Sequence, residues 1–258
     1  MKVFRPFFVI AVLILIVSLA CGAFAPSEPT PVPQPVQLQP VDSPTQASQP
    51  LPPVEQQPTD VPAPAPVSSG PFFTEEFDAD PQWYYEVIED NGGDSDPESV
   101  TTSFEFGRMI FDIPESFLYA YYIYEGEIYE DVRVDIKLEN RGVNTQQVSL
   151  VCRVSDEGWY EWAVQSDGLW YLYAVSGGYR RLTNGGSNDI KQGKDINEYG
   201  MECKGNEISF FINGEEQRGS PYVDRDLALR RGNVGFSVSS LRAIPVKIEV
   251  DWFKVSEP

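Results

Sequence analysis

The sequence contains no histidine. This absence excludes imidazole metal ligands, Ser-His-Asp and Cys-His nucleophile systems, and imidazole acid–base chemistry. Basic residues are also scarce, because 19 Lys and Arg stand against 39 Asp and Glu, for a formal net charge of −20. A surface of that sign repels nucleic acid and anionic lipid headgroups, so we expect neither as a partner. Solubility alone explains such acidity, and an affinity for cations or neutral glycans is the alternative.

Helical periodicity is missing after residue 70, apart from a short turn predicted at 224–230. Apolar and polar residues alternate instead, most plainly at 132–139, as expected of strands with one buried face. Asp-Gly at 167–168 and Asn-Gly at 213–214 are typical hairpin turns. Many short strands without helices predict an all-β sandwich or barrel. The predicted strands are 72–78, 83–88, 100–106, 108–113, 117–124, 130–139, 146–154, 158–165, 169–175, 179–183, 198–204, 206–213, 233–239 and 246–255.

Cysteine is rare, with three in the chain, and the first of them follows a hydrophobic segment. Lys2 and Arg5 precede an apolar run of 14 residues from Phe7 to Ala20, which is typical of an export signal. A segment of this kind directs the rest of the chain out of the cytoplasm. The end of this segment distinguishes a lipoprotein from a membrane-anchored or a simply secreted protein.

The residues at 18–22, Ser-Leu-Ala-Cys-Gly, resemble the lipobox of bacterial lipoproteins, although Ser18 replaces the usual Leu. The resemblance implies that residues 1–21 are a lipoprotein signal peptide and that Cys21 is lipidated. The protein would then be extracytoplasmic and lipid-anchored to the cell membrane. A membrane-spanning anchor over Phe7–Ala25 and simple secretion are the alternatives.

Residues 22–70 are dominated by Pro, Val, Gln, Ser and Thr, with 14 prolines between Pro26 and Pro66. Proline removes backbone donors, and the segment has too few large apolar groups to offset the entropy of ordering. We therefore predict a disordered Pro-rich tether with polyproline II character. Residues 71–258 remain for one folded domain, which is long enough to bury a substantial core.

Two stretches of this domain resemble a known family. Residues 148–164 read VSLVCRVSDEGWYEWAV, and residues 197–214 contain a strand ending in Cys, a Gly turn, an alternating strand and Asn-Gly. With Gly232–Phe236 and a final strand at Lys247–Val255, they resemble the concanavalin A-like lectin/glucanase superfamily, most closely its laminin-G-like and 3-keto-disaccharide hydrolase-like domains. The resemblance covers nearly all of 72–256 and implies a two-sheet antiparallel jelly-roll sandwich. Members of this superfamily include glycan-binding modules, glycosidases and adhesion domains, so the resemblance is specific for fold rather than function.

Cys152 and Cys203 are the remaining cysteines of the predicted domain. An exported domain lies in an oxidising compartment, so we predict that they form a disulfide. Two buried free thiols are the alternative.

The hairpin at 148–165 is the first candidate for a binding surface. With its turn centred on 156–157, Arg153 lies opposite Tyr160, and both share a face with Trp162. Sugar rings stack on aromatic rings, while polar side chains bind the hydroxyls. The next strand adds either Trp170 or a tyrosine pair, and packing in the core is the competing explanation for every ring. The predicted carbohydrate-binding residues are Arg153, Tyr160, Trp162, Trp170, Tyr171 and Tyr173.

Catalytic acids are the second candidate. Glu249-Val-Asp251-Trp-Phe-Lys254 is similar to the Glu-x-Asp-x-x-Glu motif of β-glucanases, but Lys254 replaces the third acid. Strand alternation explains the same residues by placing Glu249, Asp251 and Phe253 on one face. Glu161 is a better single acid but has no identifiable partner, whereas glycoside hydrolysis needs two. We therefore predict no catalytic residue.

Calcium is the third candidate, because carboxylate oxygens crowd two short segments. No EF-hand order is present, and a solvated acidic loop explains the same composition. We therefore predict no metal site and no cofactor, with Ca²⁺ as the one ion to test. The acids and amide concerned are Glu75, Glu76, Asp78, Asp80, Asp90, Asn91, Asp94 and Asp96.

Together these patterns favour non-catalytic binding of an extracellular glycan or another cell-envelope component. A glycoside or 3-keto-disaccharide hydrolase is the first alternative. A structural or adhesive domain that binds protein is the second.

Overall fold

The computed structural model describes residues 70–90, 93–227 and 229–258. The predicted signal peptide, Cys21 and the tether up to residue 69 lie outside these ranges. In the described part of the chain, no helix is both long and apolar enough to cross a membrane.

Strands are the dominant secondary structure of the described residues, as the alternating sequence predicts. One 3-10 helix, η1, spans Pro97–Ser99, with the Asp96 side chain accepting a hydrogen bond from the backbone N–H of Glu98. The strands are β1 (Phe73–Glu75), β2 (Tyr84–Glu89), β3 (Thr101–Phe104), β4 (Met109–Ile113), β5 (Leu118–Tyr129), β6 (Val132–Asn140), β7 (Gln147–Ser155), β8 (Gly158–Gln165), β9 (Leu169–Val175), β10 (Tyr179–Gly186), β11 (Ile196–Lys204), β12 (Glu207–Ile212), β13 (Glu215–Glu216), β14 (Tyr222–Val223), β15 (Gly232–Ser239) and β16 (Val246–Ser256).

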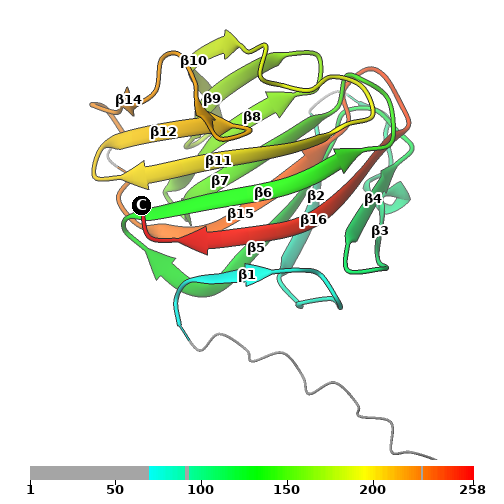
Figure 1. Ribbon diagram of the computed structural model, residues 1–258, viewed down its shortest axis with the longest axis horizontal. Coiled ribbons are helices and arrows are strands. Elements are labelled where there is room, and N and C mark those ends of the chain that lie inside the picture. Colours follow the sequence, from blue (N-terminus) through cyan, green and yellow to red (C-terminus); the bar gives the residue numbers. More distant parts are fainter. Residues whose placement is uncertain (1–69, 91–92, 228) are drawn as a thin grey trace, which may run out of the picture. The chain divides into compact units, whose positions relative to one another are not determined.

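The strands form two antiparallel sheets packed face to face (Figure 1). The nine-stranded sheet has the order β13-β12-β11-β6-β16-β4-β3, with β1 pairing with β16 and β14 with β12. The seven-stranded sheet has the order β10-β9-β8-β7-β15-β5-β2. Neighbours such as β15 and β5 are remote in sequence, so most of the fold rests on long-range pairing. The result is the predicted all-β sandwich.

The core lies between the sheets and is rich in aromatic side chains. The ring of Trp162 on β8 stacks on that of Phe210 on β12, with centroids 5.5 Å apart. The rings of Phe236 on β15 and Phe253 on β16 lie 5.5 Å apart at another point of the interface. All four side chains are fully buried. Burial of each such side chain stabilises the fold by roughly 1.5–3 kcal/mol in transfer free energy.

The predicted disulfide is confirmed. Cys152 on β7 is bonded to Cys203 on β11, so the bridge joins the two sheets through the core. The two residues are 51 positions apart in sequence. On the chain-entropy model, closing a loop of that length stabilises the folded state by roughly 4 kcal/mol.

Each predicted strand has a counterpart in the structure, and the two differ in where the strands begin and end. β5 continues to Tyr129, beyond the predicted end at 124. The very short β13 and β14 were not predicted. The helical turn predicted at 224–230 is absent from the residues described there. A bulge between Val250 and Trp252 puts Phe253 in the core, which corrects the predicted common face of Phe253 and Glu249.

Candidate functional site

A β-bulge decides which side of the seven-stranded sheet each side chain of β7 and β8 occupies. Cys152 pairs with Tyr160 and Ser155 with Gly158, so β7 has one more residue than β8 between these pairs. Arg153 lies at this bulge with a φ of 57°, in the left-handed region. A shift by one residue moves each side chain to the opposite face. Tyr160 therefore lies opposite Cys152, and the predicted pairing with Arg153 is wrong.

Four of the six predicted binding side chains are consequently inside the protein. Tyr160, Trp162, Trp170 and Arg153 have exposed fractions of 2% or less. Trp170 packs against Phe210 with ring centroids 4.8 Å apart. Their burial between the sheets agrees with the competing explanation, packing in the core, and not with a carbohydrate-binding surface.

Polar partners inside the protein satisfy two of these side chains. The Tyr160 hydroxyl donates to Asp224 Oδ2 at 2.5 Å. Arg153 Nη1 donates to the carbonyl oxygen of Leu229 at 2.9 Å. These bonds tie β7 and β8 to the segment before β15 and have a structural role.

The other two predicted side chains, Tyr171 and Tyr173, lie on the outer face of the seven-stranded sheet. Both are half-buried, and their rings are stacked with centroids 6.0 Å apart. Tyr173 pairs with Glu161 across β8 and β9, so Glu161 shares this face. Their part in glycan binding stays a prediction.

Small buried side chains underlie this face beside a groove, which we call the tyrosine groove. In the register of β7 and β15, Ser237 pairs with Ser149 and Ser239 with Gln147. Ser149, Ser237 and Ser239 are fully buried. Within the described residues, the hydroxyls of Ser237 and Ser239 have no hydrogen-bond partner. Two central strands therefore carry short polar side chains where larger ones would fill the surface.

Larger side chains from the flanking strands form the walls. A cavity of about 320 Å³ is lined by one isoleucine, three acids, three tyrosines and a glutamine. Its lining residues are Ile88, Glu89, Asp90, Tyr119, Gln147, Glu161, Tyr173 and Tyr179. A smaller hollow of about 80 Å³ shares Ile88 and continues over Tyr84, Tyr121 and Trp159. Together the two hollows make up the tyrosine groove.

Glu161 on β8 is the acid at the base of the groove, and only 1% of its surface is exposed. Its Oε2 accepts hydrogen bonds from the Tyr121 hydroxyl at 2.9 Å, from Trp159 Nε1 at 3.2 Å and from the Tyr179 hydroxyl at 3.3 Å. Burial raises the pKa of Glu161, while these donors and Ser149 act in the opposite direction. The carboxyl group is therefore held in place by four donors but strongly desolvated.

The tyrosines around Glu161 stay protonated at neutral pH. Burial raises the pKa of Tyr119 to about 12. The pKa values of Tyr121 and Tyr179 are also raised. Burial is the larger cause, and the negative charge of Glu161 is the next. The Tyr121 and Tyr179 hydroxyls also contact each other. The wall therefore presents neutral rings and hydroxyl donors rather than phenolates.

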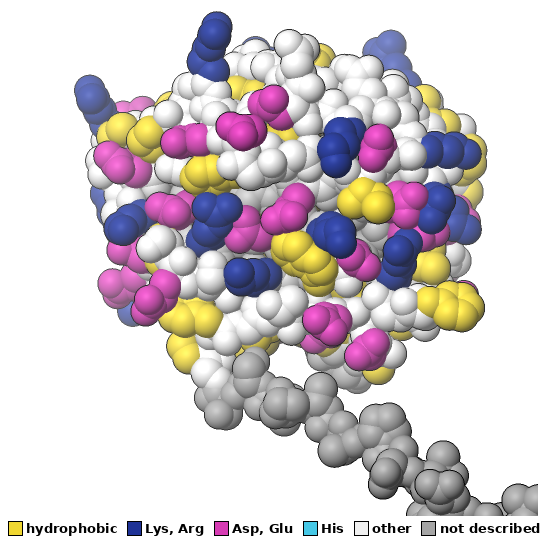
Figure 2. Space-filling view, in the orientation of Figure 1, with side chains coloured by type: hydrophobic (Ala, Val, Ile, Leu, Met, Phe, Trp, Pro, Cys, Tyr) yellow, Lys and Arg dark blue, Asp and Glu magenta, His cyan; other side chains and the backbone are white. Residues whose placement is uncertain are grey.

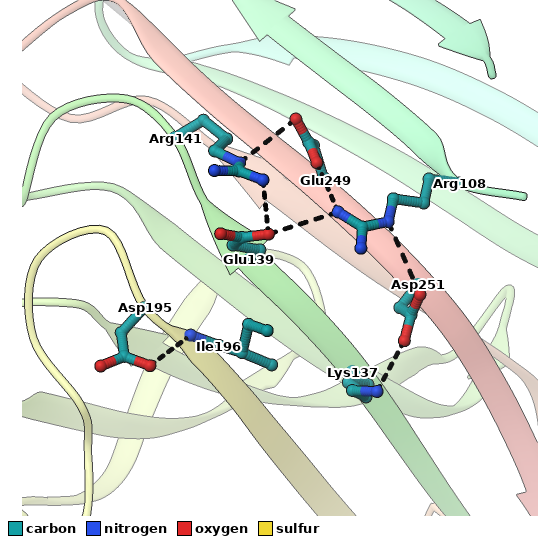
Figure 3. Close-up of polar contacts among 8 residues, drawn as sticks. All are labelled: Arg108, Lys137, Glu139, Arg141, Asp195, Ile196, Glu249 and Asp251. Carbon is teal, nitrogen blue, oxygen red and sulfur yellow. Dashed lines mark hydrogen bonds and ion pairs between the residues drawn. The ribbon is translucent and has the colours of Figure 1, made fainter. Parts of the chain in front are cut away.

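The acids of the glucanase-like motif lie on the opposite sheet, far from the groove in the fold. Glu249 forms an ion pair with Arg108 at 2.6 Å, and Asp251 forms one with Lys137 at 2.7 Å (Figure 3). Arg141 joins Glu139 and Glu249 in the same network. Each acid is paired with a base, Lys137 on β6 or an arginine at a strand end. These residues stabilise the outer face of the nine-stranded sheet.

Two of the calcium candidates accept hydrogen bonds from neighbouring groups of the protein. Asp80 Oδ1 accepts a 2.7 Å hydrogen bond from the Tyr122 hydroxyl, and Asp96 caps η1. Asn91 lies outside the described residues. Among the residues that are described, no group of three or more Cys, Asp or Glu side chains is arranged to hold a metal ion.

Sequence reasoning missed the β5 and β10 side of the groove. Tyr119, Tyr121 and Ile123 point outward, whereas Tyr122 and Tyr124 point into the core. Because β5 carries tyrosines on both faces, its alternation does not reveal which of them are exposed. Tyr179 was missed because it belongs to an edge strand with little hydrophobic pattern.

No protein-family model matches this chain, and no curated protein matches its sequence. Its fold is similar to that of solved structures. A Bacillus subtilis protein of unknown function with a galectin-like fold has a TM-score of 0.53 and 12% identity, covering 72% of this chain and 94% of that one. A Bacillus licheniformis β-glucanase has a TM-score of 0.52 and 11% identity, and the match covers 74% of this chain and 100% of that one.

A β-1,3-1,4-glucanase derived from a mouse hindgut metagenome has a TM-score of 0.53 and 12% identity, covering 72% of this chain and 99% of that one. At such low identities the likeness shows a shared fold and nothing about activity. It confirms the fold that the sequence resemblance implied.

Proposed function

We propose that this concanavalin A-like jelly roll binds a glycan chain in the tyrosine groove without hydrolysing it. The observation that carries the proposal is the groove itself, a cavity walled by tyrosines, acids and a glutamine on the outer face of the seven-stranded sheet. The 320 Å³ cavity lies within the range that holds small ligands. The glucanases of similar fold support a carbohydrate ligand by analogy.

The chemistry of the groove suits a sugar. The half-buried rings of Tyr171 and Tyr173 are flat and apolar, so the C–H face of a pyranose can stack on them. Gln147, which lines the cavity, can bond sugar hydroxyls. Displacing water from apolar rings and pairing buried polar groups both favour binding.

Hydrolysis is the alternative, as a glycoside or 3-keto-disaccharide hydrolase. It has one observation in its favour, because Glu161 shares the cavity with Glu89 and Asp90 and has a raised pKa. Against it, the Glu161 carboxyl group already accepts hydrogen bonds from four donors, whereas a glycosidase needs one acid that can transfer a proton and a second acid on the other side of the scissile bond. Turnover of chromogenic glycosides that disappears in Glu161→Gln would establish catalysis.

A glycan array with matched variants tests the binding proposal. Tyr173→Ala removes a groove wall, and we expect loss of glycan binding with little change in melting temperature. Tyr222→Ala removes a partly buried tyrosine from β14 of the other sheet and serves as the control. Equal glycan binding by both variants, or capture of a protein partner with no glycan bound, would favour the adhesive function instead.

We also propose that Cys21 carries the lipid and that residues 22–70 hold the domain away from the membrane. The export signal and lipobox resemblance support this arrangement. It would present the groove to extracellular glycans or to other components of the cell envelope.

A further inference from the structure

Glu161 has hydrogen-bond donors but no neighbouring cation. Among the described residues, no Lys or Arg forms an ion pair with it. Arg181 lies opposite Tyr173 on β10, but its side chain is exposed. Burying a carboxylate without a positive partner is costly. The raised pKa of Glu161 is the response expected of such a group.

The rest of the cavity has the same sign. Glu89 and Asp90 line it together with Glu161, and its lining contains no Lys or Arg. Glu89 accepts a 3.0 Å hydrogen bond from the backbone N–H of Ser95, so the loop holds this acid in position. Anionic ligands are therefore disfavoured, and a cation entering the cavity would gain from three nearby carboxyl groups.

Tyrosine rings provide a second, independent feature that suits a cation. Tyr119, Tyr173 and Tyr179 line the same cavity, and the rings of Tyr173 and Tyr179 meet edge to face, 5.7 Å apart. The negative face of an aromatic ring attracts an ammonium group within about 6 Å.

We propose that the tyrosine groove selects glycans carrying a free amino group, with the ammonium seated between the tyrosine rings and the carboxylate of Glu161. This inference rests on the proposed glycan-binding function and names its ligand class. An organic ammonium fits better than a metal ion, because the described acids do not form a metal-holding group. Rings also contribute to ammonium binding, whereas hard metal ions require several oxygen ligands.

The outer face of the nine-stranded sheet differs from the tyrosine groove in its charged side chains. There Lys, Arg, Asp and Glu side chains intermingle, and Arg108, Lys137 and Arg141 neutralise the acids beside them (Figures 2 and 3). Among the residues that the structure describes, no Lys or Arg forms an ion pair with Glu89, Asp90 or Glu161. The missing positive charge is therefore a local property of the groove rather than a consequence of the overall acidity.

Titration calorimetry with three matched tetrasaccharides tests the inference on the full-length protein. All three have a β-1,4-linked backbone and differ at carbon 2, which carries an ammonium (glucosamine), an acetamido group (N-acetylglucosamine) or a hydroxyl (glucose). We expect the ammonium form to bind at least about tenfold more tightly than both neutral forms. Glu161→Gln should remove this preference.

Glu207→Gln, an exposed acid on β12 of the other sheet, makes the same change in net charge and should leave the preference intact. Tyr179→Phe keeps the ring and should retain most of the preference. If all three sugars bind equally, amine selection is wrong and glycan binding stands. If none binds, both proposals fail.

Discussion

Glu161 is a buried acid whose protonation should couple to folding. Because its pKa is raised in the folded state, the folded protein binds a proton that the unfolded chain has released. The contribution of Glu161 to stability is therefore full below its ordinary pKa of 4.5 and declines as pH rises toward the raised value. The cause is the desolvation of the carboxylate by the surrounding strands.

We predict that Glu161→Gln flattens this part of the pH dependence. The amide carries no charge, so the variant should gain stability relative to the wild type as pH rises above 4.5. Urea unfolding of both proteins across pH 4–8 measures the difference. A constant difference at every pH would show that Glu161 titrates normally.

Trp162 and Tyr171 should give opposite results although both were predicted to bind glycan. Trp162→Ala removes a fully buried ring from the core and should lower the free energy of unfolding by about 3–5 kcal/mol. Tyr171→Ala changes a half-buried ring on the outer face and should cost far less stability. Chemical denaturation measures both, and a stable Trp162→Ala variant would contradict the assigned register of β8.

At the scale of elements, the bulge in β7 decides the chemistry of the sheet. It gives the inner face Cys152 and Trp162 and leaves Ser149 and Glu161 on the outer face. Without the extra residue, Tyr160 would lie opposite Arg153 and Trp162 opposite Val151, as the sequence predicted. The groove exists because β7 and β15 carry small outward side chains between strands that carry large ones.

The disulfide joins two elements that share no backbone hydrogen bonds, β7 and β11. We predict that a Cys152→Ala, Cys203→Ala double variant loses roughly 4 kcal/mol of stability, because the unfolded chain regains loop entropy. Thermal unfolding with and without reductant measures the effect. If reduction destabilises the double variant as much as the wild type, the bridge is not the cause.

At the scale of the whole molecule, charge is distributed unevenly between the two outer faces. The face of the nine-stranded sheet mixes both signs (Figure 2), whereas the groove on the other sheet is acidic and aromatic. A domain on a long tether would be free to turn the groove toward large extracellular ligands. That arrangement depends on the lipid anchor that we propose at Cys21.

We predict that Cys21→Ser abolishes incorporation of labelled palmitate and releases the protein from the membrane fraction, because serine has no thiol to form the thioether. Detergent partition and labelling of expressing cells measure both effects. Continued labelling of the variant would contradict the lipoprotein assignment, and membrane retention without a label would favour a spanning anchor.

The sequence alone determined the strands, the all-β class and the two cysteines that pair. Alternation, Asp-Gly and Asn-Gly turns and cysteine count depend on neighbouring residues or on composition, so they can be read without knowing the fold. Glu161 was visible as an isolated acid beside two aromatic residues, but its environment was not.

Only the tertiary structure decided which face of each strand is exposed. One bulge at Arg153 shifts the register of the β7–β8 hairpin by one residue and so changes which side chains share a face. No local pattern in VSLVCRVSDEG predicts this bulge. The groove joins Ile88 on β2, Tyr119 on β5 and Tyr173 on β9, which are far apart in sequence. Long-range antiparallel pairing brings them together, and such pairing depends on the packing of the whole sandwich.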